Sequence, residues 1–448
     1  MKLPNTAQKF SCALLTLLAT IVYAQAAPKI SKPNLVVILC DDLGYETVAC
    51  YGGTSYKTPN LDALAQSGVR FQNAYCTPLC SPSRVELMTG RYGFRTSWTN
   101  LIGRGGDEAN DYFDPLKEKT FGHTLKNAGY ATAIAGKWQL CDFLAHPNHL
   151  KECGFDESCM WSWVLGKKKT SRYWDPSIWQ NGKLRPNTDA KFGDDLFSDF
   201  LIDFMKRHKD QPFFVYYPMA LVHEPHVPTP DSKDGGFNKK GRDLENDAGT
   251  KKDKQQRAAK LFPGMMSYMD KTVGKVVAAI DQLGLRENTL IIFTGDNGTD
   301  RSVVSKLGDL TVRGGKGTMT EFGTHVPFIA SWKGTIAPGQ VKAELIDFSD
   351  VLPTLAEIAG AKLPENHVID GHSLAAQLRG EKGNPRDWIF TQLGHDRLAR
   401  GGNFMLHDDG TIFDVVKDPF EKQNLADNPD PAVTRAKKNL QAVLDRMK

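Results

Sequence analysis

Short, continuous apolar runs alternate with amphipathic helical patterns along most of this 448-residue chain. The apolar runs at residues 34–40, 213–222 and 289–295 lack the alternation of a half-exposed strand, which is typical of strands buried in a parallel sheet. Helical spacing of apolar residues covers 58–68, 194–208 and 265–284, and residues 120–138 read as a helix followed by a strand. This order predicts an α/β fold with a large, mostly parallel sheet and helices on both faces.

The pattern changes near the C-terminus. Residues 387–393, 402–409 and 411–416 are short segments typical of antiparallel strands. We therefore expect a catalytic domain at 27–380 and a small C-terminal α+β subdomain with an antiparallel sheet at 381–448. Residues 231–260 are rich in Lys, Asp and Gly, which predicts a solvated surface loop.

The first 26 residues have the form of a secretory signal peptide. Lys2 and Lys9 precede or flank an apolar run, 12–23, that is too short to span a bilayer, and Ala24-Gln25-Ala26 resembles a cleavage site. Its removal lowers the net charge from +4 to +2, because two lysines and no acids are lost. The predicted signal peptide indicates a secreted or periplasmic protein. No later stretch is apolar enough to span a bilayer, so we expect no stable membrane anchor. The near-neutral net charge does not indicate nucleic-acid binding.

The chain contains eight cysteines. Apart from Cys12 and Cys80, an even number remains, and an oxidising compartment favours disulfides between them. Cys153 and Cys159 are close enough in sequence to close a small loop. Buried free thiols remain an equal alternative for the others.

Polar side chains follow four of the predicted strands, and ligands bind beyond the carboxyl ends of strands in such sheets. These residues are Asp41, Asp42, Lys137, His223, His226, Asp296 and Asn297. The three carboxylates and one amide oxygen are ligands that suit a hard cation, Ca²⁺ or Mg²⁺, rather than zinc. The sequence therefore predicts a divalent metal site at this edge of the sheet.

The stretch CSPSR, residues 80–84, is predicted to open a helix with Ser81 as N-cap and Pro82 at the first helical position. Cys80 would then lie at the positive end of that helix, and Arg84 would face the same way. This arrangement suits the binding of an anion.

These motifs together resemble those of the type I sulfatases of the alkaline phosphatase superfamily. CSPSRVELMTG matches the family signature, and the chain carries the other family segments in the same order: VVILCDDLGY, GKW, HEPH, FTGDNG, RGGKGTMTEFGTHVP and IFDVVKDPFEKQNLA. The resemblance covers nearly the whole chain after the predicted signal peptide. It implies a sulfuric ester hydrolase with the alkaline phosphatase-like fold.

The resemblance also implies the chemistry. A maturation enzyme would oxidise Cys80 to formylglycine, whose hydrate attacks sulfur with one hydroxyl and releases sulfate with the other. Calcium would be bound by Asp41, Asp42, Asp296 and Asn297, with modified Cys80 completing the site. Arg84 would hold the formylglycine, Lys137 and Lys316 would bind sulfate oxygens, and His223 would protonate the leaving oxygen, whereas His226 would contact substrate.

Gln139 departs from the family, in which many members have His two residues after the motif lysine. That His is assigned to the formylglycine hydroxyl as a base, and glutamine cannot take a proton near neutral pH. A carbohydrate sulfatase remains the favoured prediction. A phosphonate or phosphodiester hydrolase and a non-catalytic protein that binds sulfated glycans remain alternatives.

The stretch 171–179 combines aromatic residues with an arginine, a composition that suits sulfated sugars if the rings are exposed and core packing if they are not. Its residues of interest are Arg172, Tyr173, Trp174 and Trp179. By family analogy, His395 and Arg400 of the small subdomain would close over the site. The substrate is expected to be a sulfated carbohydrate, with the sugar and the sulfated position left open.

Overall fold

The structure is a computed structural model that describes residue 1 and residues 32–104, 111–166, 168–232 and 249–447. The predicted signal peptide, 1–26, lies outside these described residues apart from Met1. Residues Lys32–Lys448 form one compact unit. Among the described residues, no helix has the length and apolar character needed to cross a membrane.

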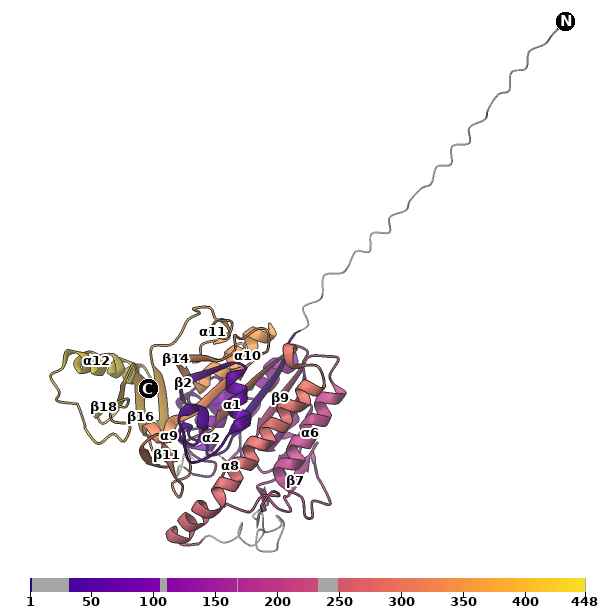
Figure 1. Cartoon of the computed structure of the whole chain (residues 1–448), viewed down its shortest axis with the longest axis horizontal. Coiled ribbons are helices and arrows are strands. Elements are labelled where there is room, and N and C mark those ends of the chain that lie inside the picture. Colours follow the sequence, from indigo (N-terminus) through magenta and orange to yellow (C-terminus); the bar gives the residue numbers. More distant parts are fainter. Residues whose placement is uncertain (2–31, 105–110, 167, 233–248, 448) are drawn as a thin grey trace. The chain divides into compact units, whose positions relative to one another are not determined.

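A ten-stranded sheet forms the centre of this unit, in the order β14-β2-β13-β10-β1-β9-β3-β4-β7-β8 (Figure 1). Strands β10, β1, β9, β3 and β4 are parallel to one another, and β14 is parallel to β2. Strand β13 is antiparallel to both β10 and β2, β7 is antiparallel to β4, and β8 is antiparallel to β7. The prediction of a mixed, mostly parallel sheet is confirmed. The strands are β1 Asn34–Cys40, β2 Val69–Tyr75, β3 Ala131–Lys137, β4 Glu157–Trp161, β7 Ile178–Gln180, β8 Lys183–Leu184, β9 Phe213–Pro218, β10 Thr289–Gly295, β13 His325–Ser331 and β14 Gln340–Asp347.

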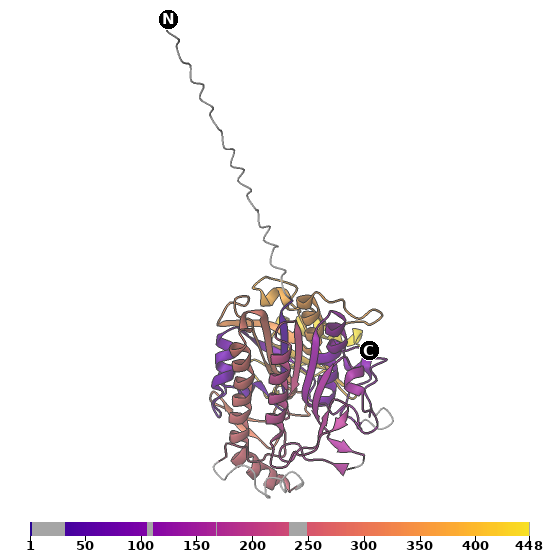
Figure 2. The same cartoon turned by 90° about the vertical axis from the view of Figure 1, so that its right-hand side faces the viewer.

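Helices cover both faces of this sheet, so every side chain of its central strands β10, β1 and β9 is buried. In β1, Val36 and Ile38 belong to one hydrophobic core and Leu35, Val37 and Leu39 to the other, as the alternation of a strand requires. The first core includes residues of α1 (Pro59–Gln66), α6 (Gly193–Arg207) and α8 (Lys251–Gln282). The second includes residues of α2 (Cys80–Thr89), α4 (Phe121–Asn127) and α10 (Val351–Ala359). Figure 2 shows the helices of the first core in front of the strands.

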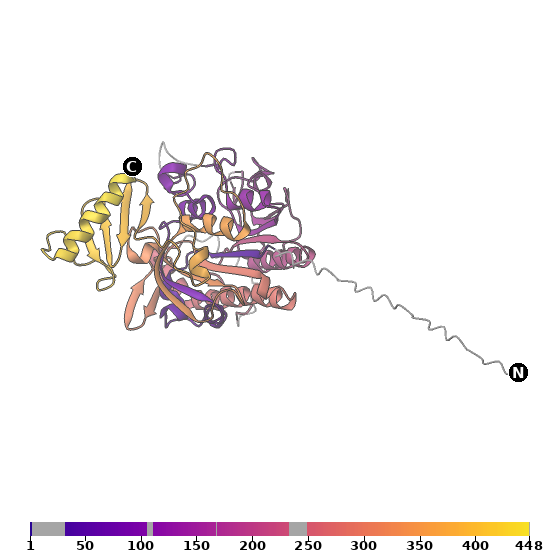
Figure 3. The ribbon, with the colours of Figure 1, turned by 90° about the horizontal axis from the view of Figure 1, so that it is seen from above.

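A separate four-stranded antiparallel sheet lies near the C-terminus, as predicted. It consists of β15 (Ile389–Leu393), β16 (Asp396–Gly401), β17 (Phe404–His407) and β18 (Ile412–Asp414) in sequence order. One face packs against α12 (Pro431–Arg446), which Figure 3 shows lying across the strands. The other face shares a small core with Tyr75 of β2 and Leu345 of β14. The domain boundary near residue 380 remains a prediction.

The remaining elements are short. They are η1 Tyr45–Thr47, η2 Ala49–Tyr51, α3 Gly93–Thr96, α5 His149–Glu152, β5 Val164–Leu165, β6 Lys168–Lys169, η4 Arg286–Asn288, β11 Val304–Leu307, β12 Leu310–Arg313, α9 Glu321–Thr324, η5 Phe348–Asp350 and α11 Ala375–Leu378. The β11–β12 hairpin precedes the loop that carries Lys316.

The prediction of a surface loop at 231–260 is wrong for its last ten residues, which form the first turns of α8. Thr250 caps this helix, because its hydroxyl accepts from the Asp253 amide while the Asp253 carboxylate accepts from the Thr250 amide. Ala258 is already buried in the core. Charged residues dominate this stretch because only one side of the helix packs against the core, and this composition led to the wrong prediction of a loop. Residues 233–248 of the predicted loop are outside the described residues.

The described cysteines, which are all except Cys12, are free. The suggested disulfide between Cys153 and Cys159 is therefore wrong. Cys159 lies in β4 and points into the first core, whereas Cys153 belongs to the second core on the opposite face of the sheet. Closeness in sequence did not bring these two thiols together, because the sheet separates them.

Candidate active site

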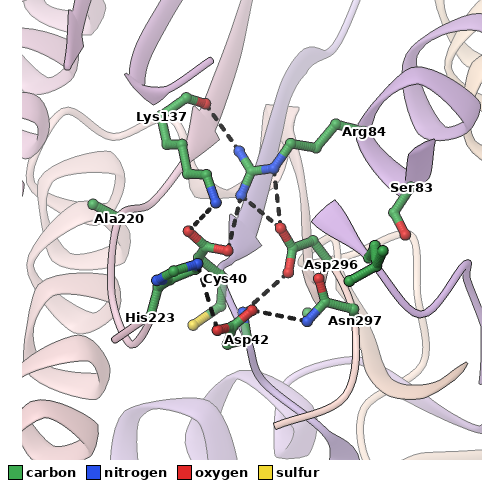
Figure 4. A network of polar contacts seen from close by, with 12 residues as sticks. Cys40, Asp42, Ser83, Arg84, Lys137, Ala220, His223, Asp296 and Asn297 are labelled. Carbon is green, nitrogen blue, oxygen red and sulfur yellow. Dashed lines mark hydrogen bonds and ion pairs between the residues drawn. The ribbon is translucent and has the colours of Figure 1, made fainter. Parts of the chain in front are cut away.

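Four neighbouring parallel strands deliver polar groups to one edge of the sheet, as the sequence predicted. In the order β10, β1, β9 and β3, the strands lie side by side, so their carboxyl ends meet. The contacts among the side chains that follow them are drawn in Figure 4. The residues brought together are Asp41, Asp42, Lys137, His223, Asp296 and Asn297, joined by Arg84 of α2 and Lys316.

Asp41 lies among cations and is fully buried. Lys137 Nζ donates to Asp41 Oδ2 at 2.6 Å, and Arg172 Nη1 lies 3.7 Å from the same oxygen. Arg84 Nη2 is 3.5 Å from Asp41 Oδ1. Burial alone would raise the pKa of Asp41, but these cations, Lys137 above all, hold it well below its usual value.

Asp42 is the second buried carboxylate. Lys316 Nζ donates to Oδ2 at 2.6 Å, Asn297 Nδ2 donates to Oδ1 at 2.9 Å, and the Asp42 amide donates to Asp296 Oδ1 at 3.0 Å. Burial raises the pKa of Asp42 to about 7, with Lys316 opposing the shift. Burial and the neighbouring charge of Asp41 also raise the pKa of Asp296. Three carboxylates held this closely therefore favour an additional positive charge.

Arg84 is fixed by three hydrogen bonds. Its Nη2 and Nε donate to Asp296 Oδ2 at 2.7 and 3.0 Å, and its Nη1 donates to the Lys137 carbonyl at 2.9 Å. The side chain is only 2 % exposed. A guanidinium held by three such bonds can turn only if the surrounding contacts break.

The helix α2 starts two residues before its predicted start. Cys80 is the first helical residue and Leu79 the N-cap, so Ser81 does not cap the helix and Pro82 occupies the third position. Ser81 Oγ instead accepts a hydrogen bond from the Ile102 amide at 3.2 Å. The shift places Cys80 itself in the first turn, where the amide dipoles favour negative charge.

The donor set fits a divalent cation. Ligand atoms of Asp41, Cys80 and Asp296 lie within 4.8 Å of one another, and those of Asp41, Asp42 and His223 form a second such group. Asp41 Oδ1 and Asn297 Oδ1 are buried and have no hydrogen-bond partner. Buried oxygens without a donor are costly unless a cation satisfies them. These residues can therefore hold a metal ion through oxygen ligands.

His223 stands at the same edge, with Nε2 3.8 Å from Asp42 Oδ2. Its Nδ1 makes a short contact with the Glu224 carbonyl, which can only accept, so Nδ1 carries a proton. Burial, followed by the charge of Arg172, lowers the pKa of His223. The backbone around Leu221 pairs with Asp41 in both directions at 2.8 Å, which fixes His223 beside the carboxylates.

The comparisons with known proteins agree with this site. The family model described as Sulfatase matches residues 33–361. The chain belongs to the sulfatase family. It is 31 % identical to arylsulfatase A of Homo sapiens, over 91 % of this chain and 87 % of that protein. It is 28 % identical to N-acetylgalactosamine-6-O-sulfatase of Bacteroides thetaiotaomicron, over 93 % of this chain and 94 % of that protein.

Solved structures show the same fold. Ps i-CgsB, solved alone and in complex with k-i-k-neocarrahexaose, matches with a TM-score of 0.73 and 26 % identity, over 92 % of both chains. The PsFucS1 sulfatase from Pseudoalteromonas sp. matches with a TM-score of 0.72 and 26 % identity, over 93 % of this chain and 90 % of that chain. The protein is therefore a sulfatase, a sulfuric ester hydrolase.

In this sulfatase, Gln139 has an unusual backbone conformation. It follows β3 by two residues, has a φ of 54°, and its Oε1 is buried without a hydrogen-bond partner. A non-glycine residue with positive φ is uncommon and indicates that its surroundings hold it there. An amide in this position is available for a bond to a ligand, and its contact with the nucleophile stays a prediction.

The aromatic side chains of residues 171–179 pack in the protein core. This was the alternative to an exposed surface that binds sugar rings. Tyr173, Trp174 and Trp179 are 0 %, 3 % and 6 % exposed. Sequence reasoning missed what Tyr173 does: its hydroxyl donates to the carbonyl oxygens of Ala220 at 2.7 Å and His223 at 2.6 Å. No local sequence pattern at Arg172 and Tyr173 signals such long-range bonds.

Three other residues were predicted to lie near the substrate, and their role there stays a prediction. His226 is 2 % exposed and packs edge-on against Phe262 of α8, at 5.3 Å between ring centroids. Arg400 is 2 % exposed, lies 3.9 Å from Glu321, and stacks on Tyr75 at 4.5 Å, so it joins the small sheet to the central one. His395 is exposed at the β15–β16 turn.

Proposed function

We propose that this sulfatase hydrolyses sulfate esters of carbohydrates, with formylglycine formed from Cys80 as nucleophile and a calcium ion bound by Asp41, Asp42, Asp296 and Asn297. The observation that most directly supports the proposal is the grouping of Cys80 with Asp41 and Asp296 within 4.8 Å. The unpartnered buried Asn297 Oδ1 is a further ligand on the same rim. Oxygen donors of this kind favour calcium over zinc.

Each group supplies one part of the chemistry. Calcium supplies a concentrated positive charge that attracts sulfate oxygens and favours an ionised nucleophile. Formylglycine, as its hydrate, supplies two hydroxyls on one carbon at the position of Cys80. The residues around them set the charge and the orientation, and their contacts support the following roles.

Arg84, Lys137 and Lys316 provide fixed positive charge. Arg84 is locked by Asp296 and by the Lys137 carbonyl, so its charge stays beside Cys80. Lys137 and Lys316 each donate to one oxygen of Asp41 and Asp42, respectively. An ammonium carries three hydrogens, which leaves donors for sulfate oxygens as charge develops during transfer.

His223 is the proposed acid for the leaving oxygen. Its Nδ1 proton is committed to the Glu224 carbonyl, so donation to the sugar must come from Nε2. Because burial and Arg172 lower the pKa of His223, a bound anionic ester is needed to favour the protonated ring.

The carbohydrate substrate class and the export of the protein are also proposals. The relatives named above include an N-acetylgalactosamine-6-O-sulfatase and a structure holding a neocarrahexaose. Extracellular sulfated polysaccharides would meet an exported enzyme, in line with the predicted signal peptide at residues 1–26. A formylglycine-generating enzyme would be required as a maturation partner.

Three measurements on one preparation test the proposal. Mass spectrometry of the Cys80 peptide should show a loss of roughly 18 Da relative to the thiol, the elemental difference made by this modification. Metal analysis should find one calcium per chain. Rates on 4-nitrophenyl sulfate, a matched phosphate diester and a matched phosphonate should rank the sulfate first, and a faster phosphonate or diester would replace the proposed reaction with that alternative.

A further inference from the structure

The loop that carries Lys316 connects the candidate active site with the small C-terminal sheet. At its start, the Lys316 amide donates to the Thr299 carbonyl at 3.0 Å, and the Gly317 amide donates to the Pro78 carbonyl at 2.9 Å. In the sequence, Thr299 and Pro78 each stand two residues from a site residue, a proposed metal ligand and the proposed nucleophile, respectively. These two bonds therefore fix the first half of the loop to the site.

The second half of the loop contacts the C-terminal part of the chain. Met319 packs against the small core that the antiparallel sheet shares with β2 and β14. The ring centroid of Phe322 in α9 lies 5.2 Å from that of Phe420. The Glu321 amide donates to Glu421 Oε1 at 2.8 Å. Two apolar contacts and one hydrogen bond to a carboxylate thus attach the end of the loop to the small sheet and to the segment that follows β18.

Glu421 satisfies a backbone group that the local chain leaves without a partner. Glu321 is the first residue of α9, and the N-cap, Thr320, makes no side-chain bond to the helix. The first amides of a helix have no acceptor within it, so they need one from elsewhere. Glu421 supplies that acceptor from 100 positions later in the chain. A carboxylate suits this task because hydrogen bonds to an ionised acceptor are stronger than those to a neutral one.

The carboxylate of Glu421 is itself held in place. Its second oxygen, Oε2, lies 3.1 Å from His407 Nε2 of β17, and the side chain is 7 % exposed. The φ of Glu421 is 54°, a conformation that residues other than glycine rarely adopt. Such a conformation persists only where the surrounding contacts outweigh its cost. Glu421 is therefore a fixed link between β17 and the start of α9.

Hydrogen bonds within the loop connect its end to Lys316. The hydroxyls of Thr318 and Thr320 are 2.7 Å apart, and Thr318 Oγ1 donates to the Gly315 carbonyl at 2.6 Å. The Thr318 amide also donates to this carbonyl, at 3.0 Å. A turn closed by these bonds has little freedom, so a shift of Glu321 should also move Lys316.

We propose that Glu421 is a positioning residue for the sulfatase reaction: by holding the start of α9, it keeps the ammonium of Lys316 directed at the sulfate oxygens. This inference rests on the proposed role of Lys316. Lys316 Nζ lies 2.6 Å from Asp42 Oδ2, so a displaced loop would also move this ammonium relative to the proposed metal site. The segment after β18 thereby takes part in turnover through the loop it supports.

Steady-state kinetics on 4-nitrophenyl sulfate, at saturating calcium and equal formylglycine occupancy, test the proposal. Glu421→Ala removes the acceptor and keeps the Cβ. We expect kcat to fall about tenfold and KM to change less than about threefold, because the charge that Lys316 stabilises develops during transfer. Thr299 and Pro78 still hold the other half of the loop, so the loss should be smaller than that caused by Lys316→Met.

The conservative variant Glu421→Gln should rescue the rate. Its side-chain amide oxygen can still accept from the Glu321 amide, so kcat should stay within about threefold of wild type. If Glu421→Ala does not fold, Glu421→Met, which keeps the side-chain length without an oxygen, takes its place. Circular dichroism and the Tm are recorded for every variant, and rates are compared at a temperature at which all are folded.

Asp430→Ala is the matched control. Asp430 lies in the same segment, and its Oδ1 accepts from the Ala432 amide at the start of α12. Its loss changes the net charge equally and removes the same kind of bond, a carboxylate to the first amides of a helix. Because α12 carries no residue of the candidate site, kcat should stay within about twofold of wild type even if the Tm falls.

A double-mutant cycle shows whether Glu421 acts through the lysine. In a Lys316→Met background, Glu421→Ala should lower kcat by less than about twofold further, since the group that it positions is gone. A full tenfold loss in both backgrounds, a wild-type kcat for Glu421→Ala, or an equal loss in Asp430→Ala would overturn the proposal. Wild type inactive on every sulfate ester, or Lys316→Met as fast as wild type, would instead refute the proposed function on which it rests.

Discussion

Lys137 Nζ lies 2.6 Å from Asp41 Oδ2, and both side chains are fully excluded from solvent. Such a pair depends on each partner, because removing one leaves the other buried and less compensated. Lys137→Met should lower the free energy of unfolding by about 3 kcal/mol in EDTA. Calcium, which would supply the missing positive charge to Asp41, should reduce that loss. Urea unfolding with and without calcium checks this, and Lys333→Met, at an exposed lysine, is the control.

The same variant should lose turnover by about 10²- to 10³-fold, the effect of removing one donor from a site of developing negative charge. The rate on 4-nitrophenyl sulfate, measured at saturating calcium, gives this number. A Lys137→Met protein as fast as wild type would show that this lysine serves only to hold Asp41.

Cys80→Ala should abolish turnover and leave the fold unchanged. Cys80 is a free thiol in the first turn of α2 and belongs to no disulfide, so its removal costs only a small buried group. Circular dichroism and the Tm report the fold, and sulfate release reports the chemistry. Cys50→Ala, which removes a half-buried thiol elsewhere, should remain active. Turnover retained after the loss of Cys80 would contradict the formylglycine mechanism.

Asn297 offers the cleanest test of the metal. Its Oδ1 has no partner in the protein, while its Nδ2 bonds Asp42 and the Gly298 carbonyl. Asn297→Ala should weaken calcium binding by about 10- to 100-fold, as expected for loss of one buried ligand, with about 1 kcal/mol lost in the metal-free state. Calorimetric titration of the apo protein measures both affinity and stoichiometry. Unchanged affinity would mean that this oxygen does not bind calcium.

Gln139 distinguishes a hydrogen-bonding role from a base. If its amide orients the hydrated formylglycine, Gln139→Leu should cost about 1–3 kcal/mol, or roughly ten- to a hundredfold in kcat. Gln139→His should keep the bond and be less harmful, although His must also adopt the positive φ of 54°. The three proteins are compared on one sulfated sugar at equal formylglycine occupancy. A leucine variant as fast as wild type would exclude contact with the nucleophile.

Glu46 gives a pH dependence of stability. Burial raises the pKa of its carboxyl to about 7, while a bond from Thr299 opposes the shift. The pKa of Glu46 is higher in the folded than in the unfolded state. The stability that its protonated carboxyl contributes is therefore fully present below about pH 4.5 and is lost as the pH rises to about 7. Glu46→Gln should remove the loss and be more stable than wild type at pH 8 by up to about 3 kcal/mol. Urea unfolding at pH 5 and pH 8, in EDTA, gives the comparison.

The sequence was sufficient for the parts of the site that sit at strand ends. Asp41, Lys137, His223 and Asp296 each follow a buried apolar run, and parallel strands bring such positions together whatever the loops do. Trp161 also ends a parallel strand, but β4 is short and begins with Glu157 and Ser158, so this strand was not predicted.

Contacts made across the fold could not be predicted in this way. The hydroxyl of Tyr173 reaches carbonyl oxygens about fifty residues away, and no local pattern marks such a bond. The first turns of α8 were not predicted, for a different reason. Charged residues dominate there and suggested a loop, whereas the cap at Thr250 favours a helix. A helix start shifted by two residues, as from Ser81 to Leu79, lies within the ordinary uncertainty of helix boundaries.

The burial of Cys80 has a consequence for the order of events in the cell. Only 2 % of this residue is exposed, and its sulfur lies among the carboxylates at the end of β1 and β10. An enzyme that must enclose the thiol in its own active site cannot reach it there. We therefore expect oxidation of Cys80 to precede folding, during synthesis or export, so that a chain which folds unmodified stays inactive however long it is later exposed to its maturation partner.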